Sequence, residues 1–175
     1  MRRHRSWFPI ILLLPLLILF RRALFLGEQF GFRDASHYYH PFYQYINSRW
    51  QSGIPLWNPL ENLGQPLLAD PTAAVFYPGK LVFGLPMEFE QCFAVYIVAH
   101  LWFAGLGLYR YAREMGANTQ GAVIGALSYE LSGQVLFQYC NPIFCVGAAW
   151  LPWSMLFAER LGNGKTSAPL MLAVS

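Results

Sequence analysis

The stretch GIPLWNPLENLGQPLLADPTAAVFYP, residues 53–78, lies at the centre of a long loop that separates the apolar segments of this chain. It is too rich in proline, glycine and asparagine for a continuous helix or a central strand, because proline lacks the N–H group that both need. It also carries Trp57, Phe76 and Tyr77, whose apolar area can offset the entropy lost on ordering. We therefore expect a folded loop beside a membrane.

The composition indicates a membrane protein. Of the 175 residues, 55% are hydrophobic, 17% are aromatic and 12% are charged, about half the charged fraction of a typical soluble domain. The net charge of +3 is small and the basic residues are scattered, which excludes nucleic acid as a partner. Cys92, Cys140 and Cys145 are odd in number and lack C-x-x-C spacing, so we interpret them as apolar packing residues.

Four apolar segments approach the length of about 20 residues that a membrane span needs. They lie at about residues 7–26, 90–109, 119–139 and 142–158, and a fifth starts at residue 167. A cleaved signal peptide is the alternative for the first segment. We therefore predict an all-α integral membrane protein with a single membrane domain over residues 1–175, the N-terminal fragment of a longer protein. Residues 27–88 would form a long, partly helical external loop.

The distribution of Lys and Arg in the short loops predicts the orientation. Basic residues lie before the first span, after the second and after the fourth: Arg2, Arg3, Arg5, Arg110, Arg113, Arg160 and Lys165. All of these loops fall on one side, so we expect a cytoplasmic N-terminus and an external first loop in contact with membrane lipid. The same topology places Cys140 and Cys145 near the external face and Ser167 near the cytoplasmic face.

An amphipathic helix is predicted at residues 41–52 of the external loop. Pro41 suits a first helical turn and Gly53 suits the position just past a helix end. Apolar residues recur at helical spacing, namely Phe42 or Tyr43, Ile46 and Trp50. Such a helix is expected to lie in the membrane interface.

Asp34 precedes this helix and begins the pattern D-x-x-H-x-x-H with His37 and His40. On a continuous helix Asp34 and His40 would lie about 240° apart, so the three residues are read as interfacial polar groups, with a divalent metal site as the alternative. By residue type alone, Asp34 caps the following helix or is simply solvated, with a general base as the alternative. Asp70 precedes a proline and is expected to fix a turn.

Glu130 falls in the middle of the third predicted span, where an unpaired charge costs a few kcal/mol or more. Spans two and three would be antiparallel, which places His100 at nearly the same depth. We therefore predict that Glu130 is hydrogen-bonded to His100 or is protonated. The alternative is that Glu130 faces a polar cavity built with later helices.

The loop resembles a known family of membrane proteins. Asp34 with the segments GIPLWNPLENLGQP, LLADP and FYPGKLVFGLP, followed by ALSYELSGQV and AWLPWSMLFAERL, resembles the YfhO family of bacterial multi-spanning membrane proteins. That family is similar to GT-C glycosyltransferases. The resemblance implies the N-terminal part of a GT-C-like fold in the bacterial plasma membrane.

The resemblance also implies an activity, namely inverting transfer of a sugar from a polyprenyl-phosphate donor to an external cell-envelope acceptor. By position, Asp34 matches the catalytic carboxylate of the family and would be the base. Arg33 would balance the phosphate, with Arg49 and Lys80 as other external cations, and no cofactor is implied. The residues expected to hold the sugar, or alternatively to hold the turns of the loop, are Trp57, Asn58, Gln65 and Asp70.

Two other classes of function stay open from the sequence. One is a membrane transporter or a lipid-linked saccharide export component without transferase activity, in which the loop would be a gate. The other is a structural membrane subunit. Internal repeats in a full-length sequence would favour the transporter.

Overall fold

A computed structural model describes residues 7–164 of the chain, and these residues are mostly helical. They form two compact units. Residues 22–96 are called the loop unit here, and the described residues of 1–21 and 97–175 are called the helical unit. Each unit has its own buried side chains and its own surface hollows.

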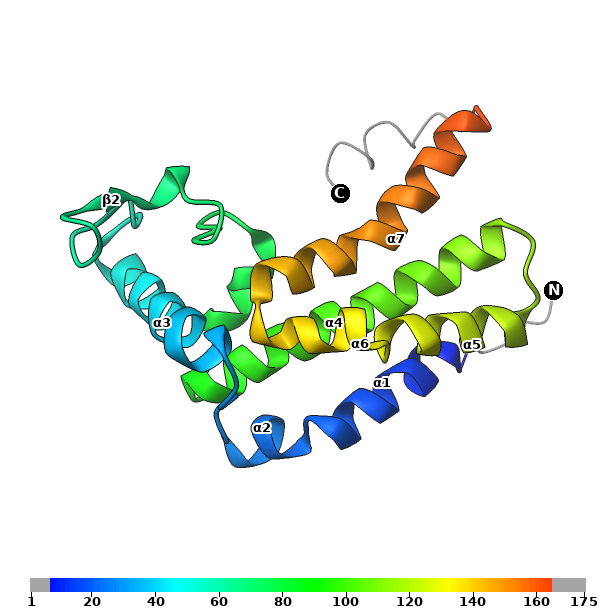
Figure 1. Cartoon of the computed structure of the whole chain (residues 1–175), viewed down its shortest axis with the longest axis horizontal. Helices are drawn as coiled ribbons and strands as arrows, with labels where there is room; N and C mark the ends of the chain where they lie inside the picture. Colours follow the sequence, from blue (N-terminus) through cyan, green and yellow to red (C-terminus); the bar gives the residue numbers. More distant parts are fainter. Residues whose placement is uncertain (1–6, 165–175) are drawn as a thin grey trace. The chain divides into compact units, whose positions relative to one another are not determined.

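The helical unit contains the apolar helices. Its elements are α1 (Phe8–Leu19), the C-terminal part of α4 (Phe89–Glu114), α5 (Thr119–Glu130), α6 (Gly133–Leu136), the 3₁₀ turn η5 (Phe137–Cys140) and α7 (Pro142–Gly162). Figure 1 shows α1 beside α5, and these two helices are in contact. The break between α5 and α6 is visible in the same view.

Helices α1 and α7 both pack on α4 through tryptophan side chains. The Trp102 indole donates to the carbonyl of Pro9 at 2.9 Å. The Trp153 ring stacks on Phe103 with centroids 4.7 Å apart, and its indole N–H donates to the Phe103 carbonyl at 3.0 Å. Gly107 permits this approach, because a Cβ there would lie 2.6 Å from the Trp153 indole nitrogen.

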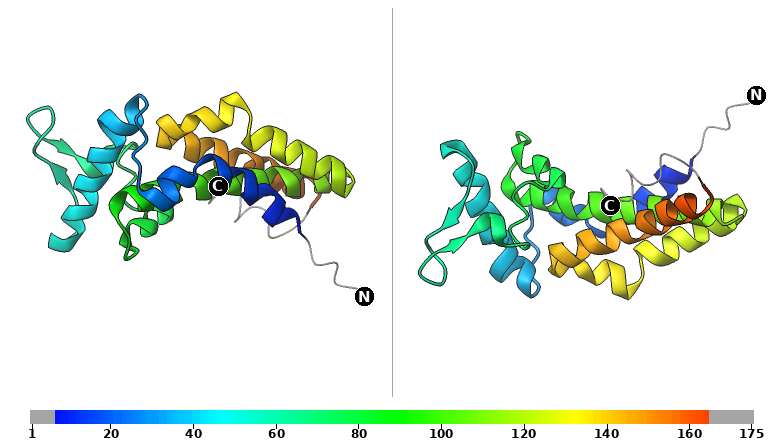
Figure 2. Two further views of the ribbon diagram at one scale, coloured as in Figure 1. Left: turned by 90° about the horizontal axis from the view of Figure 1, so that it is seen from below. Right: turned by 90° about the horizontal axis from the view of Figure 1, so that it is seen from above.

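Helices α4 and α7 run in the same direction. Phe103 meets Trp153, and further along both helices Glu114 pairs with Arg160 at 2.9 Å. The chain must therefore return between them, and α5, α6 and η5 make this return. Figure 2 shows α4, α7 and the returning segment between them from two further sides.

The prediction of four membrane-spanning helices is not supported. Among residues 7–164, α4 and α7 are the two helices that are long and apolar enough to cross a membrane, and core helices of soluble proteins also meet these criteria. Helices α1 and α5 have 12 residues each, fewer than the about 17–25 that a single spanning helix needs. The predicted start of a fifth span at residue 167 lies outside the described residues.

Local hydrogen bonds explain both missing spans. The segment 7–26 is divided at Phe20 into α1 and α2 (Arg21–Leu26), and the Arg21 guanidinium donates to the Ile18 carbonyl at the end of α1. The segment 119–139 is divided because the Ser132 hydroxyl accepts from the N–H of Val135 and caps a new helix, α6.

The loop unit is folded and partly helical, as predicted. Its elements are α2, the π-helical turn η1 (Ala35–Tyr39), α3 (His40–Arg49), the 3₁₀ turn η2 (Trp50–Ser52), strands β1 (Trp57–Asn58) and β2 (Gln65–Pro66), the 3₁₀ turns η3 (Leu67–Ala69) and η4 (Pro78–Gly84), and the first turns of α4. Strands β1 and β2 are antiparallel, with Trp57 opposite Pro66 and Asn58 opposite Gln65.

Helix α3 confirms the predicted helix but not its predicted surroundings. Gly53 follows η2 with φ +123°, a conformation that glycine adopts without strain. Phe42, Tyr43 and Ile46 are buried, and the Tyr43 ring packs edge-on against Phe83. Most of the apolar face expected to lie in the membrane interface therefore packs in the core of the loop unit, whereas Trp50 of the same face is 42% exposed.

Candidate functional site

A polar hollow of about 460 Å³ opens on the loop unit. Its lining, which defines the name polar hollow below, is Tyr38, Glu61, Asn62, Gln65, Asp70 and Thr72. A smaller hollow of about 180 Å³ shares Tyr38 and Glu61 with it and reaches His37. These volumes fall within or near the range of about 300–1,000 Å³ typical of small-molecule sites.

Glu61 organises one wall of the polar hollow. One of its carboxylate oxygens accepts from the Asn58 amide at 3.2 Å and from the Gln65 amide at 2.8 Å. Asn58 is buried, and its side-chain oxygen accepts from the N–H of Leu60 at 3.0 Å. Asn58 therefore holds the β1–β2 turn, while Gln65 lines the hollow.

Asp70 also lines the polar hollow. Its carboxylate accepts from the backbone N–H of Thr72 at 2.8 Å and from the Thr72 hydroxyl at 2.6 Å. The Thr72 hydroxyl also lies 3.3 Å from the Tyr38 hydroxyl. The turn predicted at Asp70 is present, and the same residue lines the polar hollow.

Asp34 lies at the start of η1 with its side chain exposed. The structure gives this side chain no capping hydrogen bond, so the capping interpretation of Asp34 is wrong. Residues four apart share a helical face, so Asp34 precedes Tyr38 of the polar hollow by about one turn. Arg33, the adjacent residue, is exposed and adopts φ +52°.

Trp57 is about half exposed, at 53%, with Gly64 packed against one face of its ring. A Cβ on Gly64 would lie 2.5 Å from the indole, and Gly64 has φ +108°, so both space and conformation require glycine there. Trp57 is not among the residues that line the polar hollow. Its exposed ring area is nevertheless available for stacking.

The three residues of the D-x-x-H-x-x-H pattern do not converge. Asp34 and His37 are exposed, whereas His40 is buried and its imidazole lies 3.7 Å from the Glu90 carboxylate. Burial lowers the pKa of His40, and Glu90 acts in the opposite direction. In the described part of the chain, no three His, Cys, Asp or Glu side chains gather as metal ligands.

A second hollow of about 460 Å³ in the loop unit is mostly apolar. It is called the apolar groove here, and its lining is Asn47, Trp50, Val75, Phe76, Tyr77, Pro78, Lys80, Leu81 and Gly84. Lys80 is its charged residue, whereas Arg49, the other predicted cation, is exposed and lies outside it.

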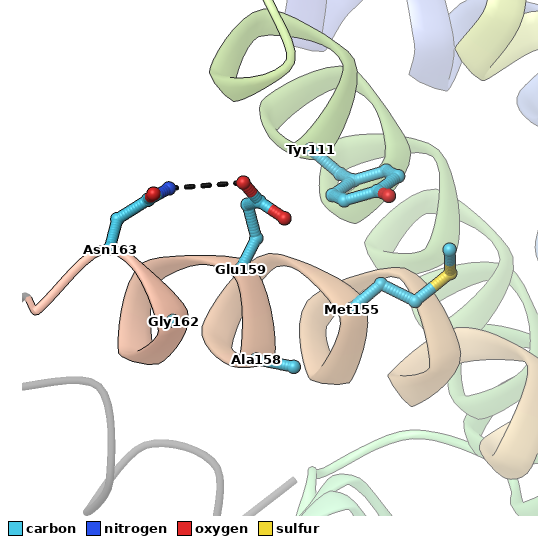
Figure 3. A pocket seen from close by; sticks show the side chains of 6 residues that line it. All are labelled: Tyr111, Met155, Ala158, Glu159, Gly162 and Asn163. Carbon is cyan, nitrogen blue, oxygen red and sulfur yellow. Dashed lines mark hydrogen bonds between the residues drawn. The ribbon is translucent and has the colours of Figure 1, made fainter.

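The helical unit has a hollow of about 390 Å³ near the ends of α4 and α7. Figure 3 shows Tyr111 and Met155 on its walls, with Glu159 accepting a hydrogen bond from the Asn163 amide at 3.0 Å. The other lining residues, Ala158 and Gly162, contribute no reactive group. We assign no chemistry to this hollow.

Glu130 at the end of α5 is fully buried, and in residues 7–164 its carboxyl oxygens have no hydrogen-bond partner. Of the two predicted states of Glu130, the hydrogen bond to His100 is therefore wrong, and the protonated carboxyl stays a prediction. Gly105 of α4 makes room for the carboxyl, because a Cβ on Gly105 would collide with it.

Comparison with protein-family models, curated proteins and solved structures finds no match to this chain. The polar hollow and the residues beside it are therefore the features that bear on function. The sequence predicted Gln65 and Asp70 of its lining but not Tyr38, Glu61, Asn62 or Thr72. The signal that could have found Glu61 is its place between Asn58 and Gln65, two amides at turn positions.

Proposed function

We propose that this chain forms part of a membrane-bound glycosyltransferase that uses a polyprenyl-phosphate sugar donor, with Asp34 as the catalytic base. The observation that carries the proposal is the state of Asp34, whose carboxylate is exposed and makes no capping bond. A carboxylate without a structural task is available to accept a proton from an acceptor hydroxyl.

The polar hollow supports a sugar as the ligand. It offers carboxylate oxygens from Glu61 and Asp70, the Gln65 amide, and the hydroxyls of Tyr38 and Thr72. Sugar hydroxyls can donate to the first two and exchange hydrogen bonds with the others. The exposed face of Trp57 adds an aromatic surface on which a second sugar ring could stack.

The proposed reaction is a single displacement. The acceptor oxygen attacks the anomeric carbon and transfers its proton to the Asp34 carboxylate. The bond from that carbon to the phosphate oxygen breaks, and its electron pair leaves with the polyprenyl phosphate, so the configuration inverts. Arg33 places a guanidinium beside Asp34 in the sequence, where it can balance the charge of the leaving phosphate.

A membrane location is supported by α4 and α7. If both of these parallel helices cross a bilayer, the chain from 119 to 140 must cross back between them. The 12 residues of α5 rise about 18 Å and the eight of α6 and η5 add about 12–16 Å, which together approach the about 30 Å of the hydrocarbon core. The proposed location is the bacterial plasma membrane, with the loop unit outside.

The substitution Asp34→Asn tests the base. It keeps the size of the side chain and removes its basicity, so we expect normal insertion and a fall in sugar transfer of about 100-fold or more. The full chain would be compared with its variant in detergent, using a radiolabelled polyprenyl-phosphate sugar and a cell-envelope acceptor. Glu88→Gln, which removes another exposed carboxylate of the loop unit, is the matched control and should retain activity.

Equal transfer by wild type and Asp34→Asn would exclude Asp34 as the base. Absence of transfer by the wild type with polyprenyl-phosphate donors would favour the second candidate, a transporter or saccharide export component. The observation that favours this candidate is Glu130, because buried ionisable groups in membrane helices commonly mark ion or substrate pathways. Transport would then be lost in Glu130→Gln and kept in Asp34→Asn.

A further inference from the structure

Lys80 of η4 holds its ammonium group inside the loop unit. The group donates to the carbonyl of Ala73 at 2.7 Å and lies 3.1 Å from the centre of the Tyr43 ring. An aromatic face and a carbonyl both favour a cation. No carboxylate in residues 7–164 forms an ion pair with Lys80, and an ammonium has three N–H donors. Lys80 therefore retains capacity to bind an anion.

The space next to this ammonium is apolar. Lys80 lines the apolar groove together with Val75, Phe76 and Leu81. Phe76 is 65% exposed and Leu81 is 80% exposed, although both are large hydrophobic side chains. A free inorganic anion would leave this apolar area in water, whereas a ligand with a hydrocarbon chain would cover it.

The groove lies close to the start of α4, one of the two helices that could cross a membrane. Gly84 at its edge ends η4, and α4 begins five residues later at Phe89. Phe83 of η4 stacks on Phe89, with ring centroids 5.1 Å apart. If α4 crosses a membrane, as proposed above, a groove attached to its first turn lies at the depth of the lipid headgroups.

We propose that the apolar groove binds one acidic phospholipid, whose phosphate pairs with the Lys80 ammonium and whose acyl chain lies along Phe76 and Leu81. The charge of the headgroup complements Lys80, and the chain covers the exposed apolar area. The site is separate from the polar hollow and does not depend on the proposed transferase activity. It would tie the loop unit to the membrane surface.

The test uses the fluorescence of Trp50, which lines the groove. The purified full chain in a non-ionic detergent is titrated with phosphatidylglycerol or phosphatidylcholine that carries brominated acyl chains, which quench nearby tryptophans. Subtracting the signal of Trp50→Phe isolates the Trp50 component. We expect half-quenching at a concentration about tenfold lower for phosphatidylglycerol, the gain expected from one charged hydrogen bond.

Three variants distinguish a specific pair between the Lys80 ammonium and the lipid phosphate from non-specific attraction of an anionic lipid to a positively charged protein. Lys80→Met should lose the preference for phosphatidylglycerol, whereas Lys80→Arg should keep it. Arg49→Met, which removes an exposed cation outside the groove, should also keep it. An unchanged preference in Lys80→Met, or equal quenching by both lipids in the wild type, would overturn the proposal. Loss of the preference on adding inorganic phosphate would show that the site binds the free anion rather than a lipid.

A pH titration keeps the test decisive if Lys80→Met fails to fold. Burial lowers the pKa of Lys80 to about 7, with Asp70 acting in the opposite direction. The ammonium therefore loses its proton as the pH rises through and above 7, while the phosphodiester stays charged. The preference should weaken over this range in the wild type and persist in Lys80→Arg, whose guanidinium stays charged. The same pH dependence in both proteins would contradict the proposal.

Discussion

The buried carboxyl of Glu130 constrains the residue that packs against it. A buried carboxyl without a partner is costly, since its hydrogen bonds to water are lost and not replaced. The sequence indicated that Glu130 would be buried in an apolar segment, but not which residue would face it. The structure places Gly105 there, whose missing side chain leaves the space that the carboxyl occupies.

The substitution Gly105→Ala tests this packing. The added methyl group would collide with the Glu130 carboxyl, so we expect a loss of about 1–3 kcal/mol in the free energy of unfolding, as for other overpacked sites. This loss of stability is measured by thermal unfolding of the purified chain in detergent, monitored by circular dichroism.

Gly125→Ala in α5 is the matched control for Gly105→Ala. A Cβ there meets nothing within 4 Å, so the higher helix propensity of alanine should leave stability unchanged or raise it by about 0.5–1 kcal/mol. Equal effects of the two substitutions would mean that Glu130 does not pack against Gly105.

Among the secondary-structure elements, the length of an apolar segment in the sequence did not predict the length of the helix that it forms. The segment 119–139 is apolar enough for one span, yet it forms α5, α6 and η5. Ser132 accounts for the division, because its hydroxyl accepts from the N–H of Val135 and donates to the Tyr129 carbonyl at 2.7 Å. One side chain thus serves both the end of α5 and the start of α6.

The substitution Ser132→Ala removes both of these hydrogen bonds. We expect the free energy of unfolding to fall by about 1 kcal/mol, as for the loss of other N-caps. Ser128→Ala, at an exposed position within α5, is the control and should change stability by less than about 0.5 kcal/mol. A larger effect at Ser128 than at Ser132 in thermal unfolding would contradict the capping role.

For the whole molecule, the direction of α7 relative to α4 determines the path that the chain must take between these two helices. The Glu114–Arg160 pair and the Phe103–Trp153 stack make the two helices parallel. If both helices cross a membrane, as proposed, the chain must cross back between them, and the broken segment 119–140 is the part of the chain available for this. The common direction of the two helices agrees with predicted spans two and four crossing toward the same side. The four long spans are not supported, and the orientation in a membrane stays a prediction.

This topology predicts that Cys140 is external. A membrane-impermeant thiol reagent should label Cys140 on intact cells, whereas Cys145 is buried and should not react. Met115→Cys in a Cys140→Ser background, at an exposed position after α4, should react only after permeabilisation. If α4 and α7 cross without a return pass, Cys140 would instead share the side of residue 115 and stay unlabelled.

The candidate site was predictable in part. Turn chemistry predicted the turn at Asp70, because such residues act over a few positions of sequence. Gln65 and the ligand-binding role of Asp70 were named only through the family resemblance. The polar hollow itself could not be foreseen, since it joins Tyr38 of η1 to Thr72, 34 residues later. The capping role weighed for Asp34 also failed, because the geometry of a cap depends on how the chain enters the helix.

The helical class, the folded and partly helical loop, the helix at α3 and its end before Gly53 were all predictable from the sequence. These follow from composition, periodicity and proline and glycine positions, which act locally. Tertiary packing was needed to show that Phe42, Tyr43 and Ile46 of α3 pack inside the loop unit and that Glu130 faces Gly105 rather than bonding to His100. Each of these depends on which apolar surfaces meet, and one amphipathic pattern fits a protein core as well as a membrane interface.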